Sequence, residues 1–122
     1  SQTIVMPAEY FDQAVQFMAA GEDAKAAAAC ESALAIEPDN PRILPLYGIL
    51  EYLLGNTGEA QKAFEHVQQL DATISERFGA AFKALVNENN FAPLLDAFEK
   101  IQAEGATIPP ALLERLHKEA QK

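Results

Sequence analysis

The stretch PRILPLYGILEYLLGNTGEAQKAF, residues 41–64, decides the fold. Its first half is apolar on nearly every side of a helix, which is expected for a helix buried between two neighbours. The GNTG segment at 55–58 provides a turn, and Ala60, Ala63 and Phe64 then begin an apolar stripe at helical spacing. We therefore expect an antiparallel helix pair here, in the middle of a larger stack.

The same pattern recurs 34 residues earlier and 34 residues later. The equivalent positions form four columns: Gly21, Gly55 and Asn89; Ala26, Ala60 and Leu94; Cys30, Phe64 and Phe98; and Ala33, Val67 and Ile101. A period of about 20 to 50 residues is typical of stacked supersecondary units that bury their apolar faces against one another. The sequence predicts one all-α domain over 1–122, with repeats at about 7–40, 41–74 and 75–108 and a last helix at about 110–120.

Caps and helix breakers set the predicted ends of the helices. The expected spans are about Ala8–Ala20, Glu22–Glu37, Pro41–Leu54, Glu59–Leu70, Ser75–Glu88, Ala92–Glu104 and Ala111–Ala120. Asn40 can cap the third helix, and Pro45 predicts either a later start or a bend in it. Ser75 is the expected cap of the fifth helix. The last helix is expected to cover the exposed face of the third repeat.

Charge and composition limit the classes of partner. The formal net charge of −9 disfavours nucleic acid and anionic lipid surfaces as partners, and it favours an apolar or basic partner. No apolar run reaches the roughly 18 to 20 residues that span a bilayer, and no secretory leader precedes the repeats. A single cysteine excludes an internal disulfide. We expect a soluble, cytoplasmic protein.

Residues capable of catalysis are few and scattered. His66 and His117 lie far apart and have no matched nucleophile or ligand set. Cys30 falls in an interior column and is predicted to be a buried structural thiol. The GNTG turn has no following lysine, so it does not predict a phosphate site. The sequence predicts neither an enzyme nor a cofactor or metal site.

These residues resemble the tetratricopeptide repeat (TPR) family over about 7–108. The second repeat carries the resemblance best: Tyr47-Gly48 and Leu54-Gly55-Asn56 stand at the family's leucine-glycine pair and turn, and Ala60 and Phe64 at its packing positions. The third repeat departs most, with Phe82 where a small residue is usual, which leaves the packing angle of that pair open. The resemblance implies a right-handed α-solenoid whose first helices line a concave groove.

The resemblance also implies which side chains face a partner. They come from the first helix of each repeat: Phe11, Asp12, Val15, Met18, Arg42, Leu46, Ile49, Tyr52, Leu53, Lys83 and Asn87. Phe11, Val15 and Leu46 stand where the family's carboxylate clamp has polar or cationic groups, so that clamp is not expected. The groove is instead mostly apolar, and Asp12 or Glu51 could meet a basic residue of the partner.

Three functions remain open at this point. The first is a non-enzymatic adaptor or chaperone-like module that binds a peptide or helix of another protein in the groove. The second is a homo-oligomeric scaffold that buries the apolar surface of the first helices. The third is a secretion-type chaperone, similar to the small acidic three-repeat TPR chaperones.

Overall fold

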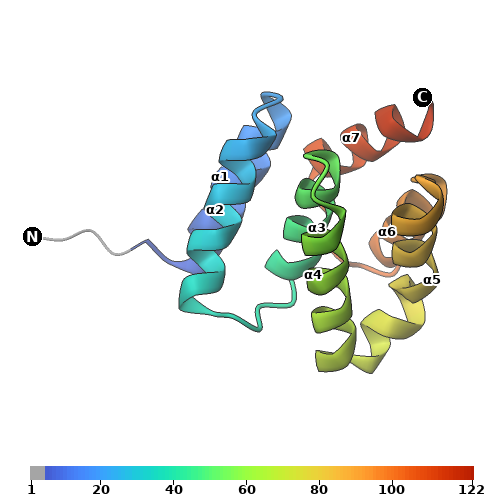
Figure 1. Cartoon of the computed structure of the whole chain (residues 1–122), viewed down its shortest axis with the longest axis horizontal. Helices are drawn as coiled ribbons and strands as arrows, with labels where there is room; N and C mark the ends of the chain where they lie inside the picture. Colours follow the sequence, from blue (N-terminus) through green and yellow to red (C-terminus); the bar gives the residue numbers. More distant parts are fainter. Residues whose placement is uncertain (1–4) are drawn as a thin grey trace, which may run out of the picture.

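The computed structural model describes residues 5–122 (Figure 1). These residues contain no strand, and they form the helices α1 (Pro7–Ala19), α2 (Asp23–Ile36), α3 (Ile43–Leu53), α4 (Thr57–Leu70), α5 (Ala72–Glu88), α6 (Ala92–Ala103) and α7 (Pro110–Ala120). The first six make three antiparallel hairpins in chain order. The all-α class and the number of helices expected from the repeat are confirmed.

The three hairpin turns share one backbone feature. Gly21 and Gly55 have φ values of 77° and 87°, and Asn89 has a φ of 53°. Glycine adopts left-handed angles without steric cost, and asparagine is one of the few other residues that tolerates them. The column that opened the repeat pattern is therefore a column of left-handed turn residues.

Two helices begin where local capping places them. Asn40 Oδ1 accepts hydrogen bonds from the backbone N–H groups of Arg42 and Ile43, at 2.9 and 3.1 Å. The start at Ile43 puts Pro45 in the first turn, where a missing N–H costs no helical bond, so the later start is confirmed. The prediction for α5 was wrong, because Asp71 accepts from Thr73 N–H at 2.9 Å and starts the helix before Ser75.

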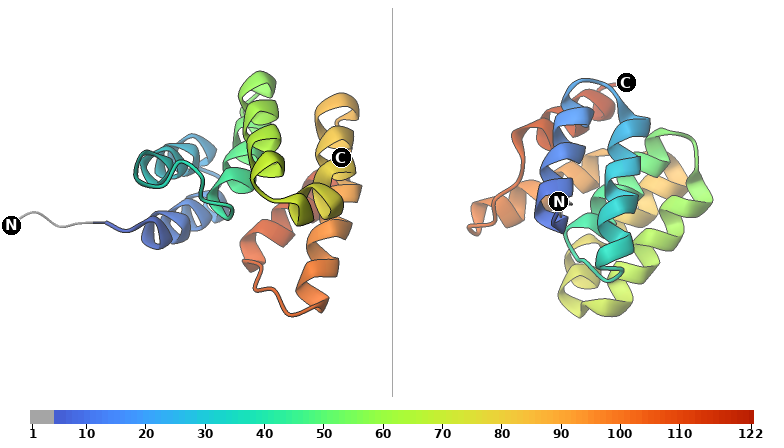
Figure 2. Two further views of the ribbon diagram at one scale, coloured as in Figure 1. Left: turned by 90° about the horizontal axis from the view of Figure 1, so that it is seen from below. Right: turned by 90° about the vertical axis from the view of Figure 1, so that its left-hand side faces the viewer.

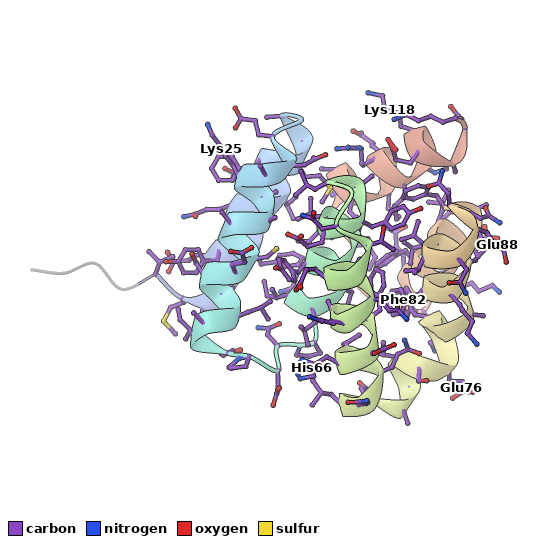
Figure 3. All side chains as sticks on the ribbon, viewed as in Figure 1. Lys25, His66, Glu76, Phe82, Glu88 and Lys118 are labelled. Carbon is purple, nitrogen blue, oxygen red and sulfur yellow. The ribbon has the colours of Figure 1, made fainter. Side chains whose placement is uncertain are left out.

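Stacked aromatic rings join the second and third hairpins. The Phe64 and Phe82 rings lie parallel with centroids 4.1 Å apart, and Phe78 continues the series to Phe98 at 4.9 Å. Figure 3 labels Phe82 at the centre of the molecule, while the labelled charged side chains lie towards its periphery. Gly48 contributes by its lack of a side chain, because a Cβ there would overlap the Phe64 ring.

The third hairpin is turned relative to the first two (Figure 2). Its second helix, α6, lies on the side of the molecule occupied by α1 and α3, and α5 lies on the side of α2 and α4. We call the side of α1, α3 and α6 the inner face. This placement differs from the expectation that α5 would supply the third set of groove residues.

The last helix, α7, also lies on the inner face. It packs against both α6 and α1, so it joins the two ends of the stack. The prediction that it covers only the third repeat was therefore incomplete. Within residues 5–122, none of the helices combines the length and apolar character needed to cross a bilayer.

Candidate ligand pocket

One end of the inner face holds an apolar pocket of about 500 Å³ that opens to solvent. We call it the inner pocket. Its walls come from α1, the start of α3, α5, α6, the 104–109 linker and the start of α7: Phe11, Pro41, Arg42, Pro45, Leu46, Ile74, Phe78, Phe98, Ile101, Ala106, Thr107, Ile108, Pro109 and Leu112. A pocket of this size with mostly apolar walls is typical of a ligand site.

The local structure explains why these residues meet. Phe78 and Phe98 contact each other edge to face, which fixes α5 against α6 at the back of the pocket. Gly105, with a φ of 108°, ends α6 and lets the chain turn into the linker. The linker then buries Ile108, and Leu112 follows from the first turn of α7. Turning the third hairpin is thus what closes the pocket on this side.

Arg42 is the one charged residue among the pocket walls. Its guanidinium carbon lies 4.2 Å from the centroid of the Phe11 ring, in cation–π contact. The Asn40 cap holds the Arg42 backbone, which fixes the base of this side chain. The pocket therefore offers an apolar interior and one cation at its rim.

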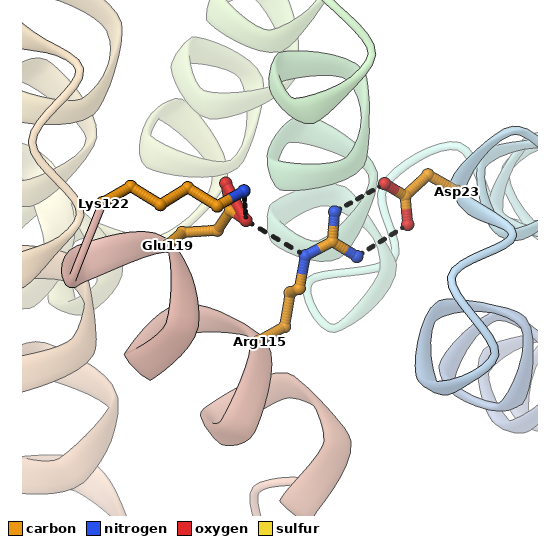
Figure 4. A network of polar contacts seen from close by, with 4 residues as sticks. All are labelled: Asp23, Arg115, Glu119 and Lys122. Atoms are coloured by element: carbon orange, nitrogen blue, oxygen red, sulfur yellow. Dashed lines mark hydrogen bonds and ion pairs between the residues drawn. The ribbon is translucent and has the colours of Figure 1, made fainter.

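The other end of the inner face is covered by α7. Leu112 and Leu116 are the buried residues of this helix, and Met18 of α1 lies beside it. Arg115 donates two hydrogen bonds to Asp23 at the start of α2, at 2.9 and 2.7 Å, and a longer one to Glu119 at 3.4 Å (Figure 4). Lys122 completes the network with Glu119 at 2.7 Å. The hydrogen bonds from Arg115 to Asp23 raise the pKa of Arg115, so the guanidinium stays charged.

The structure brings only some of the predicted partner residues together. Phe11, Arg42 and Leu46 line the inner pocket. Lys83 and Asn87 instead lie in a shallow groove between α4 and α5, because the third hairpin turns α5 away. These two residues do not share a surface with the inner pocket.

The remaining predicted residues belong to α1 and α3 and line neither the inner pocket nor the groove between α4 and α5. Asp12 is exposed on α1, Val15 and Leu53 are half-buried, and Met18 is buried beside α7. Ile49 is 0% exposed and belongs to the core. Tyr52 is half-buried, donates from its hydroxyl to Asn89 Oδ1 at 2.7 Å and contacts Phe91 edge to face.

Glu51 is not available to a basic partner. It is 5% exposed and accepts a hydrogen bond from Asn56 Nδ2 at 2.7 Å. Its carboxylate thus fixes the turn between α3 and α4. Asp12 is the other acid that the sequence proposed for this role, and it remains exposed.

Sequence reasoning missed much of the pocket wall. Phe98 and Ile101 stand in the repeat columns, Ile108 was assigned to the end of the repeats, and Leu112 to the apolar side of the last helix. The available signal was the departure of repeat 3 from the family pattern, at Phe82 and Leu94. Both residues are larger than their counterparts in the first two repeats, and both are buried, so the third hairpin needs more room around its core.

The thiol of Cys30 and the imidazole of His66 have structural surroundings: the first is buried, and the second contacts an acid on the surface. Burial, together with the nearby Glu31 and Glu51, raises the pKa of Cys30 to about 12, so its thiol stays protonated and unreactive. His66 Nε2 contacts Asp39 Oδ1 at 2.8 Å on the surface. Across residues 5–122, no cluster of three or more His, Cys, Asp or Glu side chains is arranged to hold a metal ion.

Comparison of this chain with known proteins found no matching family model, no matching curated protein and no matching solved structure.

Proposed function

We propose that this chain is a non-enzymatic protein-interaction module that binds a polypeptide segment through the inner pocket. The proposal rests on a pocket of about 500 Å³ whose fourteen lining residues include one charged residue, Arg42. Fully burying one large apolar side chain contributes about 1.5 to 3 kcal/mol, while association costs about 4 kcal/mol or more. A useful ligand must therefore place two or three apolar side chains together, as a polypeptide segment can.

The proposed architecture is of the TPR type, with two regular helix pairs and a divergent third. The 34-residue period and the matching left-handed turns at Gly21, Gly55 and Asn89 support this reading. The packing of Gly48 against Phe64 supports it further, since these residues stand at family packing positions. The turned third hairpin and α7 then distinguish this module from a regular stack.

A homo-oligomer built on Phe11 and Leu46 is the alternative. Both side chains line the inner pocket, so a second copy would cover the same surface as a peptide. Light scattering tests this alternative, because a stable dimer at all concentrations would favour it over a binding module.

The pocket assignment can be tested with Ile101→Asp. Ile101 is half-buried in the pocket wall, so its replacement changes the pocket more than the core. Peptides selected from a displayed random library on the wild-type chain would be synthesised and measured by calorimetry. We expect Ile101→Asp to weaken their binding at least tenfold, which corresponds to about 1.4 kcal/mol.

The matched control is Val86→Asp. Val86 is also half-buried, but it lies in the groove between α4 and α5. This variant should keep the affinity of the wild-type chain. Peptides that bind Ile101→Asp as tightly as the wild type would place the site elsewhere and defeat the proposal.

A further inference from the structure

Arg42 differs from the other two arginines of the chain in having no acidic partner. Arg77 pairs with Glu104 at 2.6 Å. Arg115 pairs with Asp23 at 2.7 Å, whereas no acid in the described part of the chain lies within ion-pair distance of Arg42. Eighteen acids are available to nine lysines and arginines, so a shortage of acids does not explain this difference. The charge of Arg42 remains available to a ligand.

The contacts that hold Arg42 in place leave its side-chain N–H donors unused. The guanidinium carbon lies 4.2 Å from the centroid of the Phe11 ring, and the Asn40 side chain binds only the backbone N–H of Arg42. A guanidinium carries its N–H donors in its plane and contacts an aromatic ring through its face. These donors can therefore bind a carboxylate through two parallel hydrogen bonds while the Phe11 contact is kept.

The position of Arg42 at the start of α3 also favours an anion. Arg42 is the N-cap residue of this helix. The N-terminus of a helix carries a partial positive charge, which disfavours a cation at this place and favours an anion. The stability of α3 therefore does not explain an arginine here, whereas the binding of a negatively charged group would.

A second hollow adjoins the inner pocket at the contact between Phe11 and Arg42. Its volume is about 250 Å³, and these two residues line it as well as the inner pocket. Met6 and Ile43 supply apolar walls of the second hollow, and Met6 is 53% exposed. A segment whose carboxylate reaches Arg42 can therefore place apolar residues in both hollows, whereas a chain that ended at Arg42 would leave one of them empty.

The surroundings restrict where such a carboxylate can lie. The inner pocket is apolar apart from its rim, so an acid deep inside it would lose its hydration without gaining a partner. Glu37 lines the second hollow, where its Oε2 accepts a hydrogen bond from Asn40 Nδ2 at 2.9 Å. This like charge disfavours a second acid inside that hollow. The favourable place for the carboxylate is the Arg42 guanidinium between the two hollows.

We propose that the segment bound by this chain carries an aspartate or glutamate between two apolar residues. Its carboxylate binds Arg42, one apolar flank fills the inner pocket, and the other flank fills the second hollow. This inference rests on the proposed function, because it names the class of polypeptide that the inner pocket receives. It differs from the basic partner expected from the net charge of −9, because charges are screened over about 8 Å at physiological ionic strength and the nearest charge then dominates.

The test uses peptides selected on the wild-type chain from a random library that is joined to its carrier at the C-terminus. Any carboxylate that these peptides offer is then a side chain, and we expect them to share an acid between apolar residues. The tightest binder is synthesised with an amidated C-terminus, together with a variant in which the corresponding amide replaces its acid. Calorimetry compares both peptides on the wild-type chain and on Arg42→Gln.

The expected result is a dependence on the peptide acid that disappears with the arginine. On the wild-type chain, the amide variant should bind at least about fivefold more weakly than the acid. On Arg42→Gln, the two peptides should bind equally within about twofold, and the lost contact with Phe11 affects both alike. Lys83→Gln is the control, since it removes an exposed positive charge in the groove between α4 and α5 and should keep the full difference.

Shortened peptides test the two flanks of the acid. Removal of the flank that fills the inner pocket should make the remaining peptide insensitive to Ile101→Asp. Removal of the other flank should make it insensitive to Met6→Gln, which replaces an apolar wall of the second hollow with a polar one. Full affinity of either shortened peptide would show that the segment does not extend to both sides of Arg42.

The two proposals fail in different ways. If Ile101→Asp weakens the peptides but Arg42→Gln keeps the preference for the acid, the inner pocket stands and the role of Arg42 is wrong. If Ile101→Asp has no effect while the preference for the acid needs Arg42, the inner pocket is wrong for both proposals and only the ion pair stands. A free C-terminus that raises the affinity more than the side-chain acid does would assign Arg42 to a chain end and overturn the inference.

Discussion

The middle hairpin and α7 hold to the rest of the molecule in different ways. Seven of the eleven residues of α3 are buried, and Leu50 and Ile49 at its centre are completely enclosed. α7 has the same length but only two buried residues, and it adds the Asp23–Arg115 ion pair. A helix that is apolar on all sides forms the core, whereas a helix with one narrow apolar stripe contributes only a few side chains to it.

The largest expected effect on stability comes from placing an aspartate in α3, and the same substitution in α7 should have a smaller effect. Ile49→Asp would bury an unpaired carboxylate in the core and should unfold the chain, at a cost of about 4 kcal/mol or more. Leu116→Asp should release α7 alone and leave α1–α6 helical. Circular dichroism and amide exchange measured by NMR report the two outcomes.

A matched variant of the first substitution is Leu54→Asp, at the exposed end of the same helix. It should keep the fold. The comparison between α3 and α7 would be wrong if Leu116→Asp abolished the helical signal as completely as Ile49→Asp. The resemblance placed Ile49 among the partner-facing residues, but because Ile49 lies in the core, its substitution cannot test partner binding.

The sequence predicted the first two hairpins better than the third hairpin and α7. Periodicity identified α1–α4 because each turn residue and each apolar column there obeys a local rule: Gly21 and Gly55 have left-handed angles, and Ala60 and Phe64 are buried. The inner pocket depends instead on residues distant in sequence that line one space, such as Leu46 and the 104–109 linker. No local rule specifies such an arrangement, which explains why Lys83 and Asn87, expected on one surface with Leu46, lie instead in the groove between α4 and α5.

The next effect concerns the closest packing in the middle hairpin. Gly48→Ala would drive a methyl group into the Phe64 ring, which is itself stacked on Phe82. We expect a loss of about 1 to 3 kcal/mol in the free energy of unfolding, measured by urea denaturation. Gly58→Ala is the control, since a Cβ there meets open space and should be neutral or slightly stabilising. Equal stabilities of the two variants would show that α3 and α4 are packed less closely than the structure indicates.

A smaller effect is expected at high pH, where the burial of α2 against α3 can be measured. The pKa of Cys30 is raised from 9.0 to about 12 by burial, then by Glu31 and Glu51, so folding favours the neutral thiol. Its contribution to stability is complete below about pH 9 and is lost as the pH rises towards 12. Unfolding measured at pH 8 and pH 10.5 should show the loss.

Two variants show which side chains cause the loss of stability at high pH. Cys30→Ala should make it shallower, although the truncation also removes some packing at every pH. Burial, then Glu51 and Glu31, also raises the pKa of Tyr47, so Tyr47→Phe should remove a further part. An unchanged slope in Cys30→Ala would mean that this thiol is accessible in the folded chain.

The smallest effects on stability are expected from removing one of two ion pairs that join distant parts of the chain. Asp23–Arg115 is mostly buried, with exposures of 14% and 21%, whereas Asp39 and His66 are 68% and 40% exposed. Solvent screening limits an exposed pair to about 1 kcal/mol or less, so His66→Gln should change stability little. Asp23→Asn should cost about 1 to 2 kcal/mol for the attachment of α7, detected as faster amide exchange in that helix alone. If both variants left α7 equally protected, its two leucines would be enough to hold it, and the ion pair would set only its orientation.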